Sequence, residues 1–292
     1  MTAARPSGVI AAIVTPIDAA GAPDAERFVR HARWLMANGC DGLNVLGTTG
    51  EATSFSADQR RALMTAAAEA MPDAPMMVGT GCPDLPTTIA LTRHAHAAGF
   101  AAALVLPPYY YKGVGDDGLF AFFAALVAAT ANAPIPIYLY NFPQMTGLRF
   151  SPELVGRLAD EFSGRIVGAK DSSGDLDYAA ELARIDGFDV FPSDEGSLSQ
   201  ARARGFAGCI SATVNLSAPL AGALWRAPDD AAMAERVRAA RAGIAAQPLV
   251  PAVKQLVGEL HGDEAYAVPL PPFVRLTEEQ KSKLPDLASM AV

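Results

Sequence analysis

Short apolar runs alternate with longer, Ala-rich amphipathic segments along almost the whole chain. Short aliphatic and β-branched runs are typical of strands that are buried on both faces, as strands of parallel sheets are. Eight runs are expected to be strands, namely 9–16, 42–47, 75–79, 102–106, 135–140, 166–170, 189–191 and 208–211. Their alternation with helical segments predicts parallel strands joined by helical crossovers.

The intervening segments have the start and stop signals of helices. Helices are expected over 25–38, 56–71, 85–98, 118–131 and 151–161. Ser56 and Ser151 are suited to N-cap positions because each precedes first-turn carboxylates. Gly39 and Gly99 follow two of these segments, where a glycine commonly ends a helix.

Eight strand-helix units within residues 1–227 predict a (β/α)8 TIM barrel. Residues 228–292 are expected to form additional C-terminal helices packed on the barrel. An open, doubly wound sheet is the alternative fold, since it uses the same alternation. No G-x-G-x-x-G pattern follows the first strand and no P-loop pattern occurs, so neither a dinucleotide nor a nucleotide cofactor is expected.

Composition excludes several classes of partner. The net charge of −8, with no cluster of Lys and Arg, argues against a nucleic-acid partner. No apolar stretch is long enough for a membrane span and no signal peptide is apparent, so a cytoplasmic location is expected.

Cysteine and histidine positions give no support to a metal site. Cys40, Cys82 and Cys209 are far apart in apolar surroundings, which predicts buried free thiols. The four histidines are scattered over predicted helices, so a metal centre is not expected.

Lys170 is the first candidate for chemistry at the carboxyl ends of the strands, where the active site of such a barrel lies. It is the only one of five lysines on a predicted interior strand. Burial there favours the neutral amine, which is the nucleophile that Schiff-base formation requires. A structural lysine paired with Asp171 or another carboxylate is the alternative on chemistry alone.

Tyr140, Thr48 and Thr49 are further candidates at strand ends. The Tyr140 hydroxyl could shuttle protons at the barrel mouth, although strand tyrosines are more often packing residues. Thr48 and Thr49 could bind a carboxylate through hydroxyl and N–H groups, although a Gly-Thr-Thr-Gly turn alone is a weak signal.

Four segments form a combined pattern on successive strand ends. They are Gly47-Thr-Thr-Gly-Glu51, Tyr109-Tyr110, Tyr140-Asn-Phe-Pro143 and Lys170. Together they resemble the dihydrodipicolinate synthase and N-acetylneuraminate lyase superfamily of class I pyruvate-dependent aldolases. The likeness extends from about Val9 through the segment 271–279. It implies the same barrel with added C-terminal helices that the hydrophobic pattern predicts.

The resemblance also implies roles for individual residues. Lys170 would form the Schiff base with pyruvate, and Tyr140 would be the proton shuttle beside it. Thr48 and Thr49 would hold the pyruvate carboxylate, and the main chain of Ile210 would touch the bound 2-oxo acid. The covalent Schiff base replaces any dissociable cofactor in this chemistry.

Tyr110 matches a family tyrosine that reaches into the site of a neighbouring subunit. There it completes a proton relay with the residues at the Thr48 and Tyr140 positions. The resemblance therefore implies a homo-oligomer that is at least a dimer, and commonly a homotetramer built as a dimer of dimers.

Departures from the pattern bear on the choice of reaction. Met145 occupies the position at which dihydrodipicolinate synthases use an arginine to grip the aspartate-semialdehyde carboxylate, and a methionine cannot replace that clamp. The segment 170–175, which includes Ser172, looks closer to lyases of 2-oxo-3-deoxy sugar acids and sialic acid. Asp194 and Glu195 match the acidic pair that binds substrate hydroxyls in sialate lyases, although such carboxylates are equally often helix caps.

The expected function is a Schiff-base aldolase that reversibly cleaves a 2-oxo-3-deoxy sugar acid, or a related 2-oxo acid, to pyruvate and an aldehyde. Dehydration of such an acid and condensation of pyruvate with an aldehyde are the alternatives, because both begin with the same Schiff base. A barrel that binds a sugar acid as a sensor without turnover is the non-enzymatic alternative.

Overall fold

Eight parallel strands form the centre of the fold. The computed structural model describes residues 5–291. The strands are β1 (Gly8–Ala12), β2 (Gly42–Val45), β3 (Met76–Gly79), β4 (Ala102–Val105), β5 (Ile137–Asn141), β6 (Ile166–Asp171), β7 (Asp189–Pro192) and β8 (Gly208–Ser211). Each overlaps one of the predicted runs. β1 is shorter than predicted, because the chain leaves the sheet soon after Ala12 and only the Ile13 amide still bonds to Asn44 O, at 3.3 Å.

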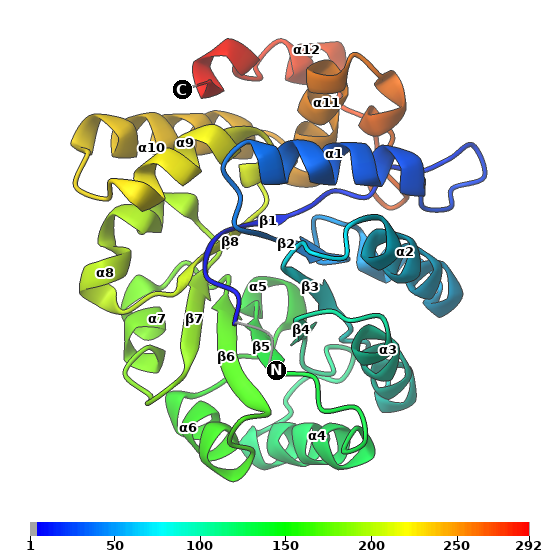
Figure 1. Ribbon diagram of the computed structural model, residues 1–292, viewed down its shortest axis with the longest axis vertical. Coiled ribbons are helices and arrows are strands. Elements are labelled where there is room, and N and C mark those ends of the chain that lie inside the picture. Colours follow the sequence, from blue (N-terminus) through cyan, green and yellow to red (C-terminus); the bar gives the residue numbers. More distant parts are fainter. Residues whose placement is uncertain (1–4, 292) are drawn as a thin grey trace.

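The strands are hydrogen-bonded in the order β7-β6-β5-β4-β3-β2-β1-β8, and neighbouring strands are parallel. β7 and β8, at the two ends of this order, also lie in contact. The sheet thus closes into a nearly complete barrel surrounded by helices (Figure 1). The (β/α)8 barrel predicted from the sequence is confirmed, and the doubly wound sheet is excluded.

Helices follow the strands as crossovers. They are α1 (Ala25–Ala37), α2 (Ala57–Ala70), α3 (Leu85–Ala97), α4 (Asp116–Ala129), α5 (Pro143–Thr146), α6 (Pro152–Glu161), α7 (Leu176–Leu182), α8 (Ala201–Arg204) and α9 (Val214–Arg226). Ser56 forms a capping box with Gln59, and Ser151 caps α6. Gly39 and Gly99 take φ values of 114° and 85° after α1 and α3, so these predicted signals are confirmed.

Strand side chains alternate between two apolar layers. Ile10 and Leu104 belong to the layer inside the barrel. Val9 and Val105, their chain neighbours, belong to the larger layer between the strands and the helices. Because successive strand residues point to opposite faces, this alternation fixes which polar side chains can reach the barrel interior.

The C-terminal segment adds α10 (Ala231–Ala245), α11 (Leu249–His261) and the short α12 (Glu278–Lys281). α11 and α12 lie beyond α1 in Figure 1, and α10 packs on α9. After α11 the chain returns to the barrel mouth, where Pro272 and Phe273 line a cavity. We propose that the barrel unit ends at residue 227, between α9 and α10.

All three cysteines are free and buried, as predicted. Burial raises the pKa of the Cys40 and Cys209 thiols, and neighbouring acidic groups raise it further. These side chains therefore act as small apolar packing groups. Within residues 5–291, no helix has both the length and the apolar character needed to cross a bilayer.

Candidate active site

Lys170 and Tyr140 meet inside the barrel, near the carboxyl ends of β6 and β5. The two residues are partners in the strand register, which shifts by one residue earlier in the pair, after Ile137. Lys170 Nζ donates to the Tyr140 hydroxyl oxygen at 3.1 Å and lies 4.4 Å from the centre of the ring. Both side chains are buried, at 4% and 3% exposure. The predicted amine and phenol are therefore in direct contact.

Thr48 extends this contact into a chain of three polar groups. Its Oγ1 lies 3.2 Å from the Tyr140 hydroxyl. The turn after β2 that carries Thr48 is closed by a hydrogen bond from Glu51 N to Thr48 O, at 3.0 Å. Leu46 and Glu51, on either side of the turn, both have left-handed backbone, which is unusual for residues other than glycine. The surrounding structure must hold this turn in place.

Asp171 does not pair with Lys170. Successive strand residues face opposite sides, and Asp171 accepts hydrogen bonds from Asn141 Nδ2 at 2.6 Å and from Ser173 Oγ at 2.8 Å. Burial raises the pKa of Asp171, and these two hydrogen bonds oppose that shift. Within residues 5–291, no carboxylate forms an ion pair with Lys170. The alternative of a structural Lys170–Asp171 pair is wrong.

A cavity of about 270 Å³ opens beside Thr48 and Tyr140. Its lining comes from the turn after β2, the ends of β3 and β4, α2, the start of the β5–α6 connection and the C-terminal tail. Its lining includes Leu46, Thr48, Glu51, Arg60, Gly79, Gly81, Leu104, Leu106, Tyr109, Tyr140 and Met145. A volume of this size suits a small organic acid.

Thr49 and Ser172 follow β2 and β6, and Ile210 lies on β8. Thr49 is buried in the same turn as Thr48. Ile210 belongs to the inner apolar layer of the barrel, on β8. Ser172 is half-buried after β6, and its amide donates to Asn141 O at 2.8 Å.

Asp194 and Glu195 lie outside the barrel wall. Four donors surround the fully buried Glu195 carboxylate at 2.5–3.0 Å, namely Ser211, Thr213, Ser217 and Arg241. Ser211 follows the inward Ile210 on β8 and therefore points outward. Asp194 accepts from Gly196 N at 2.7 Å as the cap of η2 (Glu195–Gln200) and pairs with Arg241 at 3.1 Å. Both carboxylates already have protein partners.

Tyr110 does not reach the site of its own chain. Its side chain is 74% exposed and packs edge-on against Tyr111, with the ring centres 5.4 Å apart. Tyr111 is 70% exposed. The neighbouring Tyr109 is the tyrosine of this run that lines the cavity.

Two buried cations near the site are absent from the sequence-based candidates. Lys254 on α11 pairs with Glu51, and both side chains have zero exposure. Burial lowers the pKa of Lys254, and the Glu51 carboxylate opposes this shift. Glu51 also accepts from Leu270 N at 2.6 Å. Arg60, on α2, is the second cation and is 4% exposed.

His31 and His261 meet although 230 residues separate them, so the histidines are not all scattered as the sequence indicated. His31 Nδ1 lies 3.0 Å from His261 Nε2, and His31 Nε2 lies 3.0 Å from Asn215 Oδ1. Because an amide oxygen only accepts, His31 Nε2 is the donor to Asn215. Among residues 5–291, no three His, Cys, Asp or Glu side chains come together as metal ligands.

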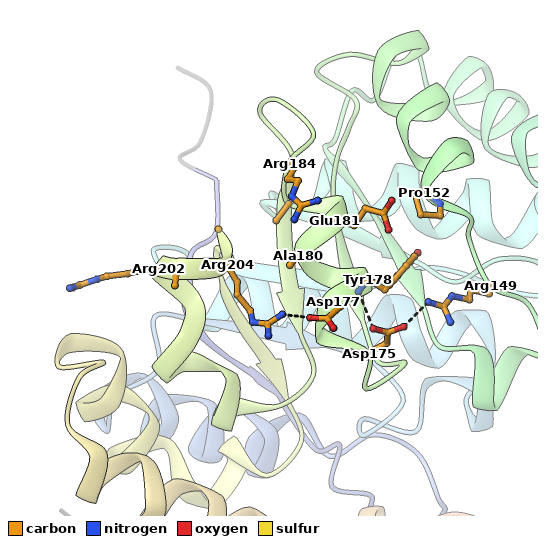
Figure 2. A pocket seen from close by; sticks show the side chains of 13 residues that line it. Arg149, Pro152, Asp175, Asp177, Tyr178, Ala180, Glu181, Arg184, Arg202 and Arg204 are labelled. Carbon is orange, nitrogen blue, oxygen red and sulfur yellow. Dashed lines mark hydrogen bonds and ion pairs between the residues drawn. The ribbon is translucent and has the colours of Figure 1, made fainter.

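A larger hollow of about 1090 Å³ lies on the outer surface, around α7 and α8 (Figure 2). Four of its charged residues form two ion pairs, Arg149 with Asp175 at 3.1 Å and Arg204 with Asp177 at 2.7 Å. Such partly exposed pairs contribute little energy. The candidate active site is placed at the barrel mouth instead, because Thr48 and Tyr140 line the cavity there and Tyr140 contacts Lys170.

Comparison with known proteins matches residues 5–291 to the model of the dihydrodipicolinate synthetase family. A 4-hydroxy-tetrahydrodipicolinate synthase of Mesorhizobium japonicum is 35% identical over 213 residues, which are 72% of this chain and 71% of that protein. The crystal structure of dihydrodipicolinate synthase from Agrobacterium tumefaciens superposes with a TM-score of 0.89 at 30% identity, over 97% of this chain and 98% of that one. A pyruvate complex of an E. coli K12 prophage protein of the same family has a TM-score of 0.87 at 28% identity, over 95% of both chains.

Two of these relatives are named as synthases. The prediction from the sequence that the chain is closer to sialate lyases therefore has only loose support. The family itself is clear, because its model matches nearly the whole chain and the barrel superposes on solved members over almost their full length. The chain belongs to the dihydrodipicolinate synthetase family of class I aldolases, whose enzymes form a Schiff base between pyruvate and a lysine.

Proposed function

We propose that the protein is a Schiff-base lyase that reversibly cleaves a 2-oxo-3-deoxy sugar acid, or a related 2-oxo acid, to pyruvate and an aldehyde. The observation that carries this proposal is the buried contact of Lys170 Nζ with the Tyr140 hydroxyl at 3.1 Å, which continues to Thr48 at 3.2 Å. A nucleophilic amine needs a neighbouring group that can move protons, and the phenol is placed to do so.

In the proposed reaction the neutral amine of Lys170 attacks C2 of the 2-oxo acid, and loss of the oxygen as water leaves an iminium. Tyr140 donates the proton that this water carries away. The resulting phenolate takes the proton of the C4 hydroxyl, the C3–C4 bond breaks and an aldehyde departs. The bonding electrons pass to the iminium and form an enamine. Protonation at C3 and hydrolysis then release pyruvate and restore the amine.

In this proposal the carboxylate at C1 lies against Thr48, Thr49 and the Ile210 main chain. The turn that contains the two threonines offers hydroxyl and N–H donors, which suit a carboxylate. Ser172, on the loop after the reactive lysine, borders the same mouth and would contact the substrate. For Glu195 we propose a structural role, because its oxygens accept four hydrogen bonds within the protein.

Met145 favours cleavage over condensation with aspartate semialdehyde. Its side chain is 65% exposed and lines the cavity, where it supplies no charge to grip a second carboxylate. Dehydration of a 2-oxo-3-deoxy acid is the second candidate. The same iminium can lose a C3 proton to give an enamine, whose electrons then expel the protonated C4 hydroxyl as water. A panel of these acids, assayed for pyruvate and for dehydrated product by mass spectrometry, separates the two reactions.

Borohydride trapping tests the Schiff base directly. Incubation with pyruvate and borohydride should add one reduced pyruvyl group to the peptide that contains Lys170. Lys170→Ala should abolish the adduct, whereas Lys283→Ala, at an exposed surface pair, should leave it unchanged. Modification of another lysine, or an unmodified wild-type protein, would refute the mechanism and leave the sensor alternative.

We also propose that the active species is a homo-oligomer built on a two-fold dimer, with a dimer of dimers as the complete assembly. Two adjacent tyrosines with exposures of 74% and 70% are unusual on a surface that faces only water, which supports their burial by a second copy. Lys170→Ala and Tyr110→Phe chains refolded together should recover activity that neither has alone. If hybrid oligomers form but activity is not recovered, Tyr110 does not contribute to the neighbouring subunit's site.

A further inference from the structure

Arg60 is a buried cation whose two hydrogen-bond partners are both neutral. It projects from α2 and is 4% exposed. Nη2 donates to the Gly79 carbonyl oxygen at 2.9 Å, and Nη1 donates to Cys82 Sγ at 3.0 Å. Nε is buried without a hydrogen-bond partner. In the described part of the chain, 5–291, no carboxylate lies within ion-pair distance of this guanidinium.

This arrangement is unusual because a guanidinium stays protonated and buried charges are normally paired. Cys82 does not supply the missing anion. Burial raises the pKa of its thiol, and the lowering by Arg60 does not overcome that effect, so the sulfur is a neutral thiol at pH 7. A buried cation in such a setting is suited to receive an anionic ligand.

The cavity connects Arg60 with Thr48 and with Tyr140, the phenol that contacts Lys170. Arg60, Thr48 and Tyr140 all line the same space of about 270 Å³. Arg60 is the only Lys or Arg among the described residues in that lining. The carboxylate of Glu51 also borders the cavity, but it is neutralised by Lys254. An anion in the cavity would therefore meet one uncompensated positive charge.

The backbone packs closely beside Arg60, so that only glycine fits at two positions of this wall. A Cβ at Gly79 would collide with the Leu46 carbonyl, and a Cβ at Gly81 would collide with the backbone of Leu106. The rest of this wall is apolar, with Leu46, Leu104 and Leu106 facing the cavity. The apolar wall strengthens the interaction between Arg60 and an anion because it excludes water.

We propose that Arg60 binds a second carboxylate, at the end of the substrate away from the Schiff base, so that the enzyme acts on a dicarboxylic 2-oxo acid. The inference rests on the proposed function and narrows its substrate class. The C1 carboxylate lies at Thr48 and the distal carboxylate lies at Arg60. Met145 leaves the exposed side of the cavity uncharged, so the cation that selects the substrate comes from α2.

The experiment compares two substrates of equal chain length, a 2-oxo-3-deoxy aldaric acid and the 2-oxo-3-deoxy aldonic acid that ends in a hydroxymethyl group. Wild-type protein should have the higher kcat/KM for the dicarboxylate. Arg60→Met should lower that value by roughly 10- to 100-fold, as expected for loss of a charge-assisted hydrogen bond. It should change the value for the aldonic acid by less than about threefold, which is the scatter typical of such contacts.

Two further variants sharpen the comparison. Arg60→Lys should retain part of the preference, because it keeps the charge but loses the planar fork of donors. Arg61→Met is the matched control, since Arg61 is the next residue of α2 and pairs with Asp58 on the surface. Equal loss of activity on both substrates, or the same effect from Arg61→Met, would overturn the assignment of Arg60.

Pyruvate trapping at Lys170, measured on every variant, separates the two proposals. Absence of trapping in wild-type protein refutes the proposed function. Trapping without a preference for the dicarboxylate refutes only the role of Arg60.

If Arg60→Met does not fold, a competition experiment in wild-type protein tests the role of Arg60 instead. Dicarboxylic acids must compete with substrate more strongly than monocarboxylic acids of equal length. The proposal is overturned if dicarboxylic and monocarboxylic acids compete with the substrate equally well. It is also overturned if the dicarboxylic acids change the reaction rate without competing with the substrate.

Discussion

Lys254→Met tests whether a buried ion pair holds the turn that carries Thr48. Glu51 ends this turn in left-handed backbone, and its carboxylate contacts Lys254 from α11 and the Leu270 amide from the C-terminal tail. Lys254 Nζ also donates to Thr15 O at 2.9 Å, beyond the end of β1. Three segments that are distant in sequence therefore meet at one carboxylate.

The magnitude follows from the environment left behind in the variant. Methionine fills most of the space of the lysine stem, so the cost comes from a carboxylate buried without its partner, about 3–5 kcal/mol. We therefore expect a loss of about 4 kcal/mol at pH 7.

Urea unfolding of wild-type and variant protein at pH 7 measures this difference. The double variant Lys254→Met/Glu51→Gln should regain most of the stability, since it removes both charges and keeps an oxygen for the Leu270 amide. Lys283→Met, at an exposed pair, should change stability by less than about 0.5 kcal/mol. Pyruvate trapping by Lys254→Met should also slow, because the Thr48 turn loses its anchor. A loss below about 1 kcal/mol at pH 7, or a double variant no better than the single one, would refute the reasoning.

Three further predictions concern single residues. Tyr140→Phe should lower turnover by roughly 10²–10⁴-fold while trapping of pyruvate at Lys170 persists. Unchanged turnover would show that Tyr140 is a packing residue and does not transfer protons. Burial lowers the pKa of His31 to about 3, so only the unfolded state gains a proton as the pH falls below about 6.5. Unfolding free energy should drop by about 2 kcal/mol between pH 6.5 and 5, and His31→Gln should flatten that slope in urea titrations. Met145→Arg should raise the rate of any weak condensation with aspartate semialdehyde, measured as product formation. An unchanged rate would show that Met145 does not indicate the type of reaction.

The strands and the Lys170–Tyr140 contact could be predicted because they depend on local periodicity. A buried parallel strand is a short apolar run, and a polar residue at its carboxyl end must lie at the barrel mouth. Lys170 and Tyr140 end neighbouring strands, so their meeting needs no knowledge of side-chain packing. The one-residue register shift after Ile137 could not be foreseen, yet it keeps the two residues level.

The direction of polar residues just past a strand could not be predicted in the same way. Asp194 and Glu195 follow β7 and were expected in the mouth, but the chain turns into η2 and buries Glu195 against Ser211 and Arg241. Arg241 comes from α10, whose packing on η2 has no local signature. The same holds for Glu51 and Lys254, which are 203 residues apart. Contacts of this kind depend on how whole helices pack.

Arg60 illustrates how a barrel can change its substrate without changing its chemistry. The Schiff-base amine and its phenol come from β6 and β5, whose positions are fixed by the sheet register. The cation that we propose for the distal carboxylate comes from α2, outside that register, and lines the cavity while it donates to the Gly79 carbonyl oxygen. Substitutions at Arg60 or Met145 would alter the charge of the cavity and leave the hydrogen bonds of Lys170 and Tyr140 in place. Selection of the substrate and formation of the Schiff base are therefore separable, which is why trapping at Lys170 and the preference for a dicarboxylate can be measured as independent properties of one protein.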